Sequence, residues 1–499
     1  MTKVASSVVW FRRDLRLHDH PALTEAARSG APVAPLFVID PALLRGRFAS
    51  ANRTWFLLGA VRALSDSLAA RGSHLFVRVG RATEVVPAFA RDVGAGSVLV
   101  SREIGPYGRR RDRAVAAALE RSGVKFRTMR GVLVHEPEEV VTGDGLGYRV
   151  FTPFLRRWEA LPIEAILPVP DRIIGIEAAG GRRAVDDAVP SAADLGVGEP
   201  TAHDRHLPEP GEQAARRRLA AWLDSGPTRG PSAYAVTRDE LADGGTSRLG
   251  PDLRLGLLSP VEVATRALAV DGAGPGSRRF ASELAWRDFY AHILWRDPRI
   301  AHEAFQRRYV GVEWPNGTHA DPSSAASDLI VAWREGQTGY PVIDAAMRQL
   351  MATGFMPNRA RMIVASFLTK DLLVDWRVGE AHFMEHLLDG DPASNLGGWQ
   401  WAASVGTDAQ PYFRVFNPVT QAERFDPDGR YVRRWVPELA QVPTARIQAP
   451  WTMTRDEQVA SGCRIGSDYP APIVDHAEAR RRAIAWHQLI RDGTAESGP

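Results

Sequence analysis

Apolar runs of strand length alternate with helical patterns over residues 1–130, and this alternation constrains the fold more than any other feature. It predicts an α/β domain built on a doubly wound parallel sheet. Sheets of this type bind ligands at the carboxyl ends of their strands. The expected strands are Val4–Phe11, Val33–Ile39, His74–Val79, Ser97–Val100 and Val124–Met129, and the expected helices are Thr54–Ala70, Thr83–Arg91 and Arg110–Ser122.

The pattern changes after residue 130, and strand signals nearly vanish from Glu212 onward. Residues 131–210 are punctuated by Pro, Gly and acidic residues, so we expect an interdomain connector there. Residues 211–475 carry helical spacing and predict an all-α domain, and residues 476–499 predict a C-terminal helix with a short tail. The expected helices are Ala214–Leu223, Pro260–Leu268, Phe280–Trp295, Val342–Thr353, Arg359–Leu372 and Gly379–Leu388.

The composition agrees with two domains and excludes several classes of protein. A chain of 499 residues is too long for one compact core. The net charge is only +3, so a local basic face would have to bind any nucleic acid. Cys463 is the only cysteine, which excludes an intrachain disulfide and a cysteine-rich metal site. A single cysteine also suits a reducing compartment, so we expect a cytoplasmic protein, and we expect no metal. No run approaches the ~18 apolar residues of a membrane span.

Residues 389–401 read Asp-Gly-Asp-Pro-Ala-Ser-Asn-Leu-Gly-Gly-Trp-Gln-Trp and combine acids, an amide, glycines and indoles. This combination suits a large, flat aromatic ligand with polar edges, because glycines permit close approach and tryptophans offer their faces. The alternative is a buried turn in which the acids are hydrogen-bonded and the indoles fill the core. No G-x-G-x-x-G motif follows the first strand, which disfavours an ordinary dinucleotide-binding enzyme.

Further motifs upstream favour the ligand-binding interpretation. They are Gly245-Thr246-Ser247-Arg248-Leu249, Glu283–Tyr290 and Asn358–Met362, and they occur in this order. Together with residues 389–401 they resemble the photolyase/cryptochrome family of blue-light flavoproteins, and most of all the bacterial class I cyclobutane pyrimidine dimer photolyases. The resemblance extends to Trp10–Leu17 and to Ile473–Arg480, so it covers nearly the whole chain.

The resemblance implies a deoxyribodipyrimidine photo-lyase, in which photoexcited reduced FAD gives an electron to a flipped-out pyrimidine dimer in damaged DNA. We expect a monomer. The alternative is a non-repairing blue-light photoreceptor of the same fold, although signalling members often carry a longer C-terminal tail. A flavoprotein reductase is a further alternative, but it leaves Glu283, Trp286 and Trp401 unexplained.

For the cofactor, the resemblance implies that residues 245–250 bind the FAD pyrophosphate and that Asp389 and Asp391 contact the isoalloxazine and ribityl portions. Arg361 would pair with Asp389, and Asn395 would face the reactive ring nitrogen. Family members with Asp or Cys in place of Asn395 tend to be signalling cryptochromes, so the asparagine favours repair. The implied cofactor-binding residues are Tyr234, Thr246, Ser247, Arg248, Leu249, Gly250, Phe280, Arg287, Asn358, Arg361, Asp389, Gly390, Asp391 and Asn395.

For the substrate, a damaged dinucleotide must leave the duplex to reach a buried flavin. Aromatic walls can stack on its bases, and polar groups can bind the pyrimidine edges. The resemblance assigns the walls to Trp286 and Trp401 and the hydrogen bonds to Glu283, whereas the simpler interpretations are a core indole and a solvated acid. The other implied DNA-binding residues are Arg238, Asn358, Arg359, Met362 and Gln421, of which Arg238 and Gln421 lie nearer the DNA backbone.

The resemblance also implies an electron path from the protein surface to photoexcited flavin. Trp399, Trp376 and Trp314 match its three tryptophans, although Trp314 precedes an inserted loop at Asn316–Ser327. Trp333 is the weaker candidate for the outer end of the path.

Three departures from the family put flavin affinity and dimer contacts in doubt. Gly250 stands where the family usually has a serine, Phe280 where it has a tryptophan, and Pro357 where it has a histidine. An antenna chromophore binds the first domain in this family, and Ser101-Arg102-Glu103 occupies a region of antenna contacts. The candidates are an 8-hydroxy-deazaflavin, which we favour, and methenyltetrahydrofolate.

Overall fold

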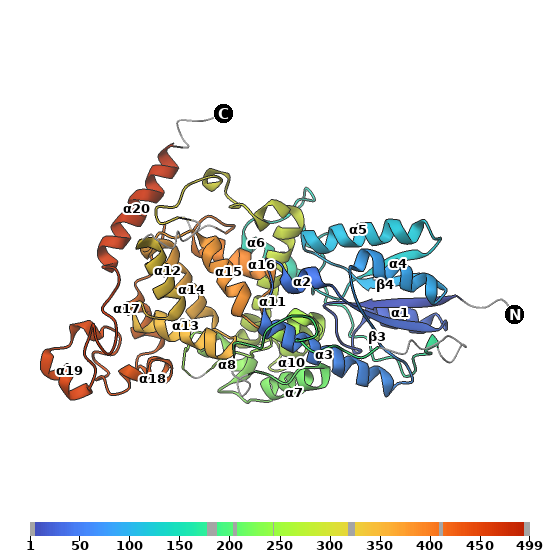
Figure 1. The fold of residues 1–499 in the computed structure, drawn as a ribbon, viewed down its shortest axis with the longest axis horizontal. Helices are drawn as coiled ribbons and strands as arrows, with labels where there is room; N and C mark the ends of the chain where they lie inside the picture. Colours follow the sequence, from blue (N-terminus) through green and yellow to red (C-terminus); the bar gives the residue numbers. More distant parts are fainter. Residues whose placement is uncertain are drawn as a thin grey trace.

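The computed structural model describes residues 5–176, 187–202, 207–242, 244–317, 325–408 and 413–493. Its first part is a five-stranded sheet with strand order β3-β2-β1-β4-β5, and every neighbouring pair is parallel (Figure 1). The predicted α/β domain is therefore confirmed. The strands are β1 Ser6–Phe11, β2 Val33–Ile39, β3 Phe76–Val79, β4 Ala95–Ser101 and β5 Lys125–Met129. Val4, in the first expected strand, lies outside the described residues.

The two faces of the sheet are buried against different helices, because successive side chains of a strand point to opposite faces. Val8 and Trp10 join the core beneath α4 and α5. Val9 and Phe11 join a second core, beneath α1 and α3, that continues into the helical domain. The helices of this domain are α1 Pro21–Arg28, α2 Pro41–Arg45, α3 Ala51–Ala69, α4 Ala82–Asp92 and α5 Pro106–Glu120.

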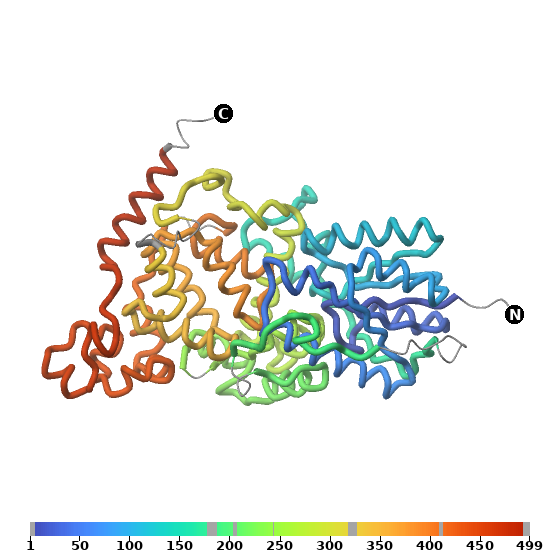
Figure 2. Tube along the Cα trace, in the orientation of Figure 1, coloured from blue at the N-terminus to red at the C-terminus, as the bar shows by residue number. Residues whose placement is uncertain are grey.

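The described residues of the predicted connector include a helix, α6 Phe151–Ala160, which the sequence analysis did not expect. After α6 the chain returns along α3, as the trace in Figure 2 shows. Asn52 donates a hydrogen bond to Thr201 Oγ1 at 3.2 Å, and Arg62 donates one to the carbonyl oxygen of Pro190 at 3.0 Å. The connector is thus attached to the sheet domain.

The second half is helical, as predicted, and the described residues after β5 contain no further strand. The expected helix Arg359–Leu372 is divided into α14 and a π-helical turn at Phe367–Asp371. The helices are α7 Glu212–Leu223, α8 Gly230–Thr237, α9 Gly250–Leu255, α10 Pro260–Ala269, α11 Pro275–Arg296, α12 Ala325–Glu335, α13 Pro341–Thr353, α14 Asn358–Ser366, α15 Trp376–His386, α16 Pro392–Ala402, α17 Pro418–Phe425, α18 Arg430–Trp435, α19 Arg455–Ser461 and α20 His476–Gly493.

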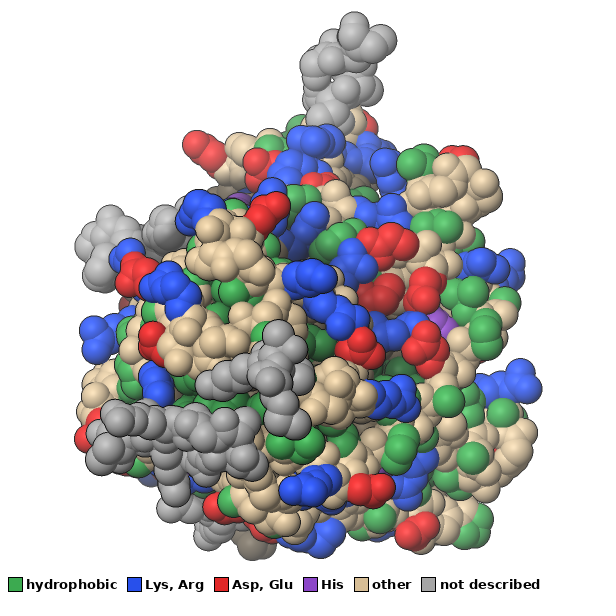
Figure 3. Space-filling view, turned by 90° about the vertical axis from the view of Figure 1, so that its right-hand side faces the viewer, with side chains coloured by type: hydrophobic (Ala, Val, Ile, Leu, Met, Phe, Trp, Pro, Cys, Tyr) green, Lys and Arg blue, Asp and Glu red, His purple; other side chains and the backbone are tan. Residues whose placement is uncertain are grey.

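The loop after β1 joins the two domains. Leu15 N–H donates to the carbonyl oxygen of Leu255 at 3.2 Å, and Arg16 donates to that of Gly256 at 3.1 Å. The carboxyl end of the sheet therefore faces the helical domain. Figure 3 views the molecule from the end where the sheet domain lies, away from the helical domain. Basic and acidic side chains are interspersed among the described residues of this face. Within the described residues, no helix is both long enough and apolar enough to cross a membrane.

Candidate functional site

The segment 389–401 forms a turn followed by the helix α16. Asp391 caps this helix, since its carboxylate accepts hydrogen bonds from the N–H groups of Ala393 and Ser394, each at 3.1 Å. Pro392 takes the first helical position, where no hydrogen bond is lost. The acids therefore lie at the start of the helix, and its body carries Asn395, Trp399 and Trp401.

Asp389 forms an ion pair with Arg361 on α14, as the resemblance implied. Arg361 Nη2 lies 3.1 and 2.9 Å from the two carboxylate oxygens of Asp389. Gly250, at the start of α9, lies directly against this acid, because a Cβ atom there would stand 2.5 Å from Asp389 Oδ2. The departure at Gly250 thus has a physical reason: a side chain at this position would displace Asp389.

Asp391 lies among arginines from both domains. Arg13, which follows β1, donates to Asp391 Oδ2 at 3.0 Å. Burial alone would raise the pKa of Asp391, but the charges of Arg13, Arg254 and Arg287 lower it to about 2. Asp391 is therefore an anion at neutral pH. We refer to Asp389, Asp391, Arg13, Arg254, Arg287 and Arg361 as the acid–arginine cluster.

The cluster reaches the switch point of the sheet, where the strand order reverses between β1 and β4. Arg13 follows β1 and lies 3.5 Å from Glu103, which follows β4. Arg254 donates from Nε to the carbonyl oxygen of Gly390 at 2.8 Å, while its buried Nη1 meets no hydrogen-bond partner in the part of the chain that the structure describes. Burial, together with the neighbouring charge of Arg13, lowers the pKa of Arg254 to about 10. The sequence analysis missed Arg13 and Arg254, although the position of Arg13 at the carboxyl end of a strand was a usable signal.

The turn 245–250 offers several groups to an anion. Thr246 Oγ1 is buried and has no hydrogen-bond partner among the described residues, which is costly unless a ligand or water binds it. Arg248 has a left-handed backbone with φ of 53°, and its guanidinium lies 4.6 Å from the ring centre of Phe355. Leu249 N–H donates to Ser247 Oγ at 3.4 Å. A hydroxyl, a guanidinium and a tight backbone turn are the groups expected around a pyrophosphate.

The remaining implied flavin residues differ in their surroundings. Tyr234 and Phe280 are buried and meet edge to face, with ring centroids 5.3 Å apart. Arg287 donates to the carbonyl oxygen of Val132 at 2.7 Å, which joins α11 to the start of the connector. Asn358 is exposed at the start of α14. Phe280, where the resemblance leads one to expect a tryptophan, thus packs against the implied flavin neighbour Tyr234.

Asn395 is held by residues that the sequence analysis missed. Its amide nitrogen donates to the backbone oxygen of Glu380 at 2.9 Å and to the Glu380 carboxylate at 3.2 Å. Glu380 is fully buried and accepts from Arg47 of the sheet domain at 2.8 Å. These contacts fix the orientation of the Asn395 amide.

Glu283 and Trp286 lie one turn apart on α11, and each already has a partner. Glu283 forms an ion pair with Arg238, and Arg279 lies 3.5 Å away. Trp286 stacks on Phe151 of α6, with centroids 3.6 Å apart and planes at 10°. One face of the Trp286 indole is therefore covered, and the side chain is only partly buried.

Other implied DNA-binding residues lie on α14, α16 and α17. Met362 and Trp401 line a small pocket of about 20 Å³, and Asn358 contacts Met362 Sδ at 3.8 Å. Arg359 forms an ion pair with Asp239 at 2.7 Å, and Gln421 lies partly buried on α17. Because α16 packs against both α11 and α14, these residues share one region of the helical domain. We refer to Glu283, Trp286, Met362, Trp401 and Arg238 as the substrate group.

The implied electron path is buried. Trp399 and Trp376 are almost fully buried on the neighbouring helices α16 and α15. Gly379 lies directly against the six-membered ring of Trp399, so a larger residue would push this indole away. Trp333 meets Trp399 edge to face, with centroids 6.0 Å apart. Trp314 is also buried, at 7% exposure, so it does not lie at the surface end of the path.

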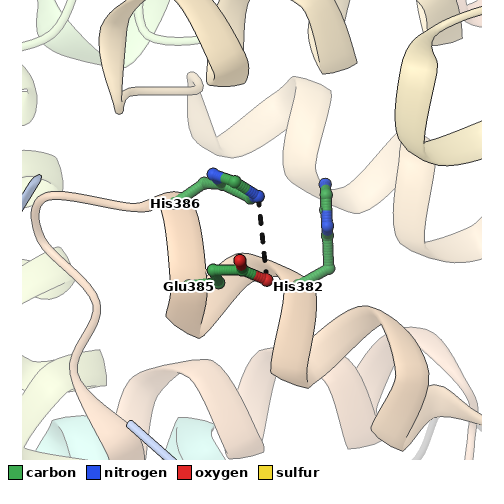
Figure 4. A group of neighbouring side chains, drawn as sticks. All are labelled: His382, Glu385 and His386. Carbon is green, nitrogen blue, oxygen red and sulfur yellow. Dashed lines mark ion pairs between the residues drawn. The ribbon is translucent and has the colours of Figure 1, made fainter. Parts of the chain in front are cut away.

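Among the described residues, one group could place three ligand atoms near a metal ion: His382, Glu385 and His386 on α15 (Figure 4). The ligand atoms lie within 4.8 Å of one another, and Glu385 is exposed. Burial is the main cause that lowers the pKa of His382, and the charges of His386 and Arg334 lower it further, to about 3. The positive charge of Arg334 opposes a cation at this place, so the cluster gives no reason to assign a metal.

Two protein-family models match the chain. The model described as "DNA photolyase" matches residues 7–171, and the one described as "FAD binding domain of DNA photolyase" matches residues 280–488. A curated relative from Halobacterium salinarum, named deoxyribodipyrimidine photo-lyase, is 40% identical over 497 residues, covering 97% of this chain and 98% of the relative.

Two solved structures are similar over nearly the whole chain. A bacterial class III photolyase from Agrobacterium tumefaciens is 35% identical, with a TM-score of 0.86 and 99% of both chains covered. A cryptochrome from Synechocystis is 29% identical, with a TM-score of 0.87, covering 97% of this chain and 99% of its own.

Proposed function

The chain belongs to the DNA photolyase family, and from this premise we propose that it splits cyclobutane pyrimidine dimers in DNA under blue light. One observation carries the proposal beyond family membership. Arg361 of the acid–arginine cluster lies on α14 beside Met362, and Asp391 caps α16, which bears Trp401. Arg287 of the cluster lies on α11, which bears Trp286 and packs against α16. Groups suited to a flavin and groups suited to a flipped pyrimidine dimer are thus held side by side.

The residues fit FAD. The unpartnered Thr246 hydroxyl and the turn 245–250 suit its pyrophosphate, and the Asp389–Arg361 pair suits the polar edge of its ring system. When bound and reduced, FAD supplies the electron that opens the dimer after excitation by light. Asn395, held by Glu380, offers a neutral amide to the flavin ring without adding a charge.

The substrate group recognises the dimer once it has left the duplex. Trp286 and Trp401 stack on the pyrimidines, and Phe151 holds the Trp286 ring from behind. The Glu283 carboxylate accepts hydrogen bonds from the pyrimidine N–H groups, for which it must loosen its ion pair with Arg238. Arg359 and Gln421 contact the DNA backbone beside this pocket.

A non-repairing photoreceptor is the weaker candidate. The similarity to a cryptochrome structure does not separate the two functions, because a class III photolyase is equally similar in fold. The relative at 40% identity is named a photo-lyase, and Asn395 in place of an acid agrees with repair.

We further propose that the antenna chromophore is an 8-hydroxy-deazaflavin at the switch point of the sheet, between Arg13, Glu103 and Arg254. Buried guanidinium groups, including the unpartnered Arg254 Nη1, favour a chromophore whose ring itself is anionic. Incubation with a purified deazaflavin should add its absorption band to the spectrum of the protein, and Arg254→Ala should abolish the band. A band added by methenyltetrahydrofolate instead would contradict this assignment. We also propose a monomer that works in the cytoplasm.

A light-dependent repair assay tests the main proposal. The full chain with FAD bound, chemically reduced, should restore a thymine-dimer oligonucleotide under blue light and not in the dark. The Trp399→Phe variant separates repair from photoreduction, because phenylalanine keeps an aromatic filler but loses the easily oxidised indole. This variant should photoreduce oxidised flavin poorly, yet repair near the wild-type rate after chemical reduction. Absence of repair by the fully reduced wild type would contradict the proposal.

A further inference from the structure

Trp314 is the outermost of the three tryptophans in the proposed electron path, but another indole covers it. Trp486 on α20 lies over Trp314, with ring centroids 4.7 Å apart and planes at 45°. This spacing is that of aromatic rings in direct contact. Trp314 is 7% exposed, whereas Trp486 is only partly buried. An electron that arrives from the solvent therefore reaches Trp486 before Trp314.

We propose that Trp486 is a fourth and outermost tryptophan of this path. The inference rests on the proposed function and on the electron path through Trp399, Trp376 and Trp314 that the family resemblance implies. After Trp314 has been oxidised, Trp486 gives it one electron, and no bond forms or breaks. A thiolate in the surrounding solution then gives one electron to Trp486 and becomes a thiyl radical. The oxidised site thus moves to the protein surface, where solvent reductants have access.

The position of Trp486 is fixed by contacts on both sides of it along α20. His476, at the start of the helix, lies 2.5 Å from Asp371. His487, the neighbour of Trp486, is paired with the Tyr309 hydroxyl at 3.1 Å and packs on Phe413, with ring centroids 3.8 Å apart. Burial, then the charge of Lys370, lowers the pKa of His487 to about 3, so its ring stays neutral. A helix anchored in this way holds the Trp486 ring against Trp314.

The chain offers a matched control. Trp451 is also a partly buried tryptophan of the helical domain, and it meets the ring of Tyr340 at 5.2 Å. Tyr340 is not a member of the path. Replacing Trp451 with phenylalanine therefore removes an indole of similar exposure without touching the proposed route.

The test compares Trp486→Phe, Trp314→Phe and Trp451→Phe in the full chain with oxidised FAD bound and a thiol as reductant. Trp486→Phe should slow photoreduction several-fold and shorten the lifetime of the oxidised tryptophan in transient absorption. Trp486→Tyr, which keeps an oxidisable ring, should recover part of the rate. Trp451→Phe should match the wild type. The inference would be overturned if Trp486→Phe kept the wild-type photoreduction rate and the wild-type lifetime of the oxidised tryptophan while Trp314→Phe was slow.

Repair after chemical reduction separates this inference from the proposed function. Reduced Trp486→Phe should repair dimers at the wild-type rate, because repair does not use the path. If Trp486→Phe still repairs dimers slowly after full chemical reduction, Trp486 does more than supply electrons to the flavin, and the inference is contradicted. If the reduced wild type repairs nothing, the proposed function fails, whatever Trp486 does to photoreduction.

Discussion

The acid–arginine cluster and the substrate group lie on neighbouring helices, but they are held in different ways. The cluster is fixed across the two domains, and Arg13 and Asp391 stand 378 residues apart in the chain. The substrate group keeps aromatic faces partly exposed. Its acid, Glu283, forms an ion pair with Arg238, the residue that directly follows α8. The difference indicates that the cofactor side is organised before DNA arrives, whereas the substrate side must exchange partners during binding.

The largest expected effect is on the cofactor side. Asp391→Asn keeps a good helix cap but removes a negative charge that Arg13, Arg254 and Arg287 share, and Glu103 remains as the acid beside Arg13. Breaking a buried ion pair in this way should lower the free energy of unfolding by ~3–5 kcal/mol. Urea unfolding of the full chain measures this loss. Asp239→Asn, which removes the partly exposed partner of Arg359, should cost at most ~1 kcal/mol. Equal losses would contradict the comparison.

The same acid predicts a pH dependence. The pKa of Asp391 is lowered to about 2 in the folded state, so its contribution is complete above its unfolded pKa of about 4. The stabilisation should disappear as pH falls from about 4 to about 2. Asp391→Asn should therefore differ from the wild type in stability at neutral pH and converge with it in acid.

Gly250 tests the cluster by steric means. Gly250→Ala places a Cβ atom 2.5 Å from Asp389 Oδ2, so the acid must move away from Arg361. Such overpacking should cost ~1–3 kcal/mol in stability and release FAD during purification. The matched control is Gly398→Ala, because a Cβ atom at Gly398 would have no atom of the described residues within 4 Å. Retention of FAD by both variants would contradict the assigned place of Asp389.

On the substrate side, Trp286→Ala and Trp401→Ala should each weaken binding of dimer-containing DNA by ~1–3 kcal/mol, the stacking energy of one base. Flavin content should stay unchanged, because neither residue belongs to the cluster. Fluorescence anisotropy in the dark measures the affinity. The control is Trp295→Ala. Trp295 lies on α11, and its ring contacts Arg102 and Arg109 of the sheet domain, so this variant should bind DNA as the wild type does.

The smallest expected effect concerns Arg238. If Arg238 only contacts a phosphate, Arg238→Ala should weaken binding of damaged and intact DNA alike. It should also reduce the slope of the logarithm of the binding constant against the logarithm of the salt concentration by ~0.9. Its ion pair with Glu283 predicts in addition a greater loss for damaged DNA, because the acid is no longer oriented. Arg238→Lys should restore the slope but not the full discrimination. Equal weakening of both DNA types would reduce Arg238 to a backbone contact.

The sequence predicted those features that depend on local pattern. Apolar runs located all five strands, and the family resemblance implied the pairing of Arg361 with Asp389. The helix α16 was readable from Asp391-Pro392, an acid cap before a proline, but Gly397 and Gly398 in its interior obscured it. Contacts between distant segments were not predictable, because no local pattern encodes them. Arg13 with Asp391, Phe151 with Trp286, and Trp486 with Trp314 are all of this kind.

The most direct test of the account is the affinity of the full chain, with FAD bound and in the dark, for one strand with and without a single thymine dimer. The account predicts tighter binding of the dimer-containing strand, and a preference that falls in Trp401→Ala while the flavin remains bound. Equal affinity of the wild type for both strands would contradict the central claim that Glu283, Trp286 and Trp401 recognise the lesion.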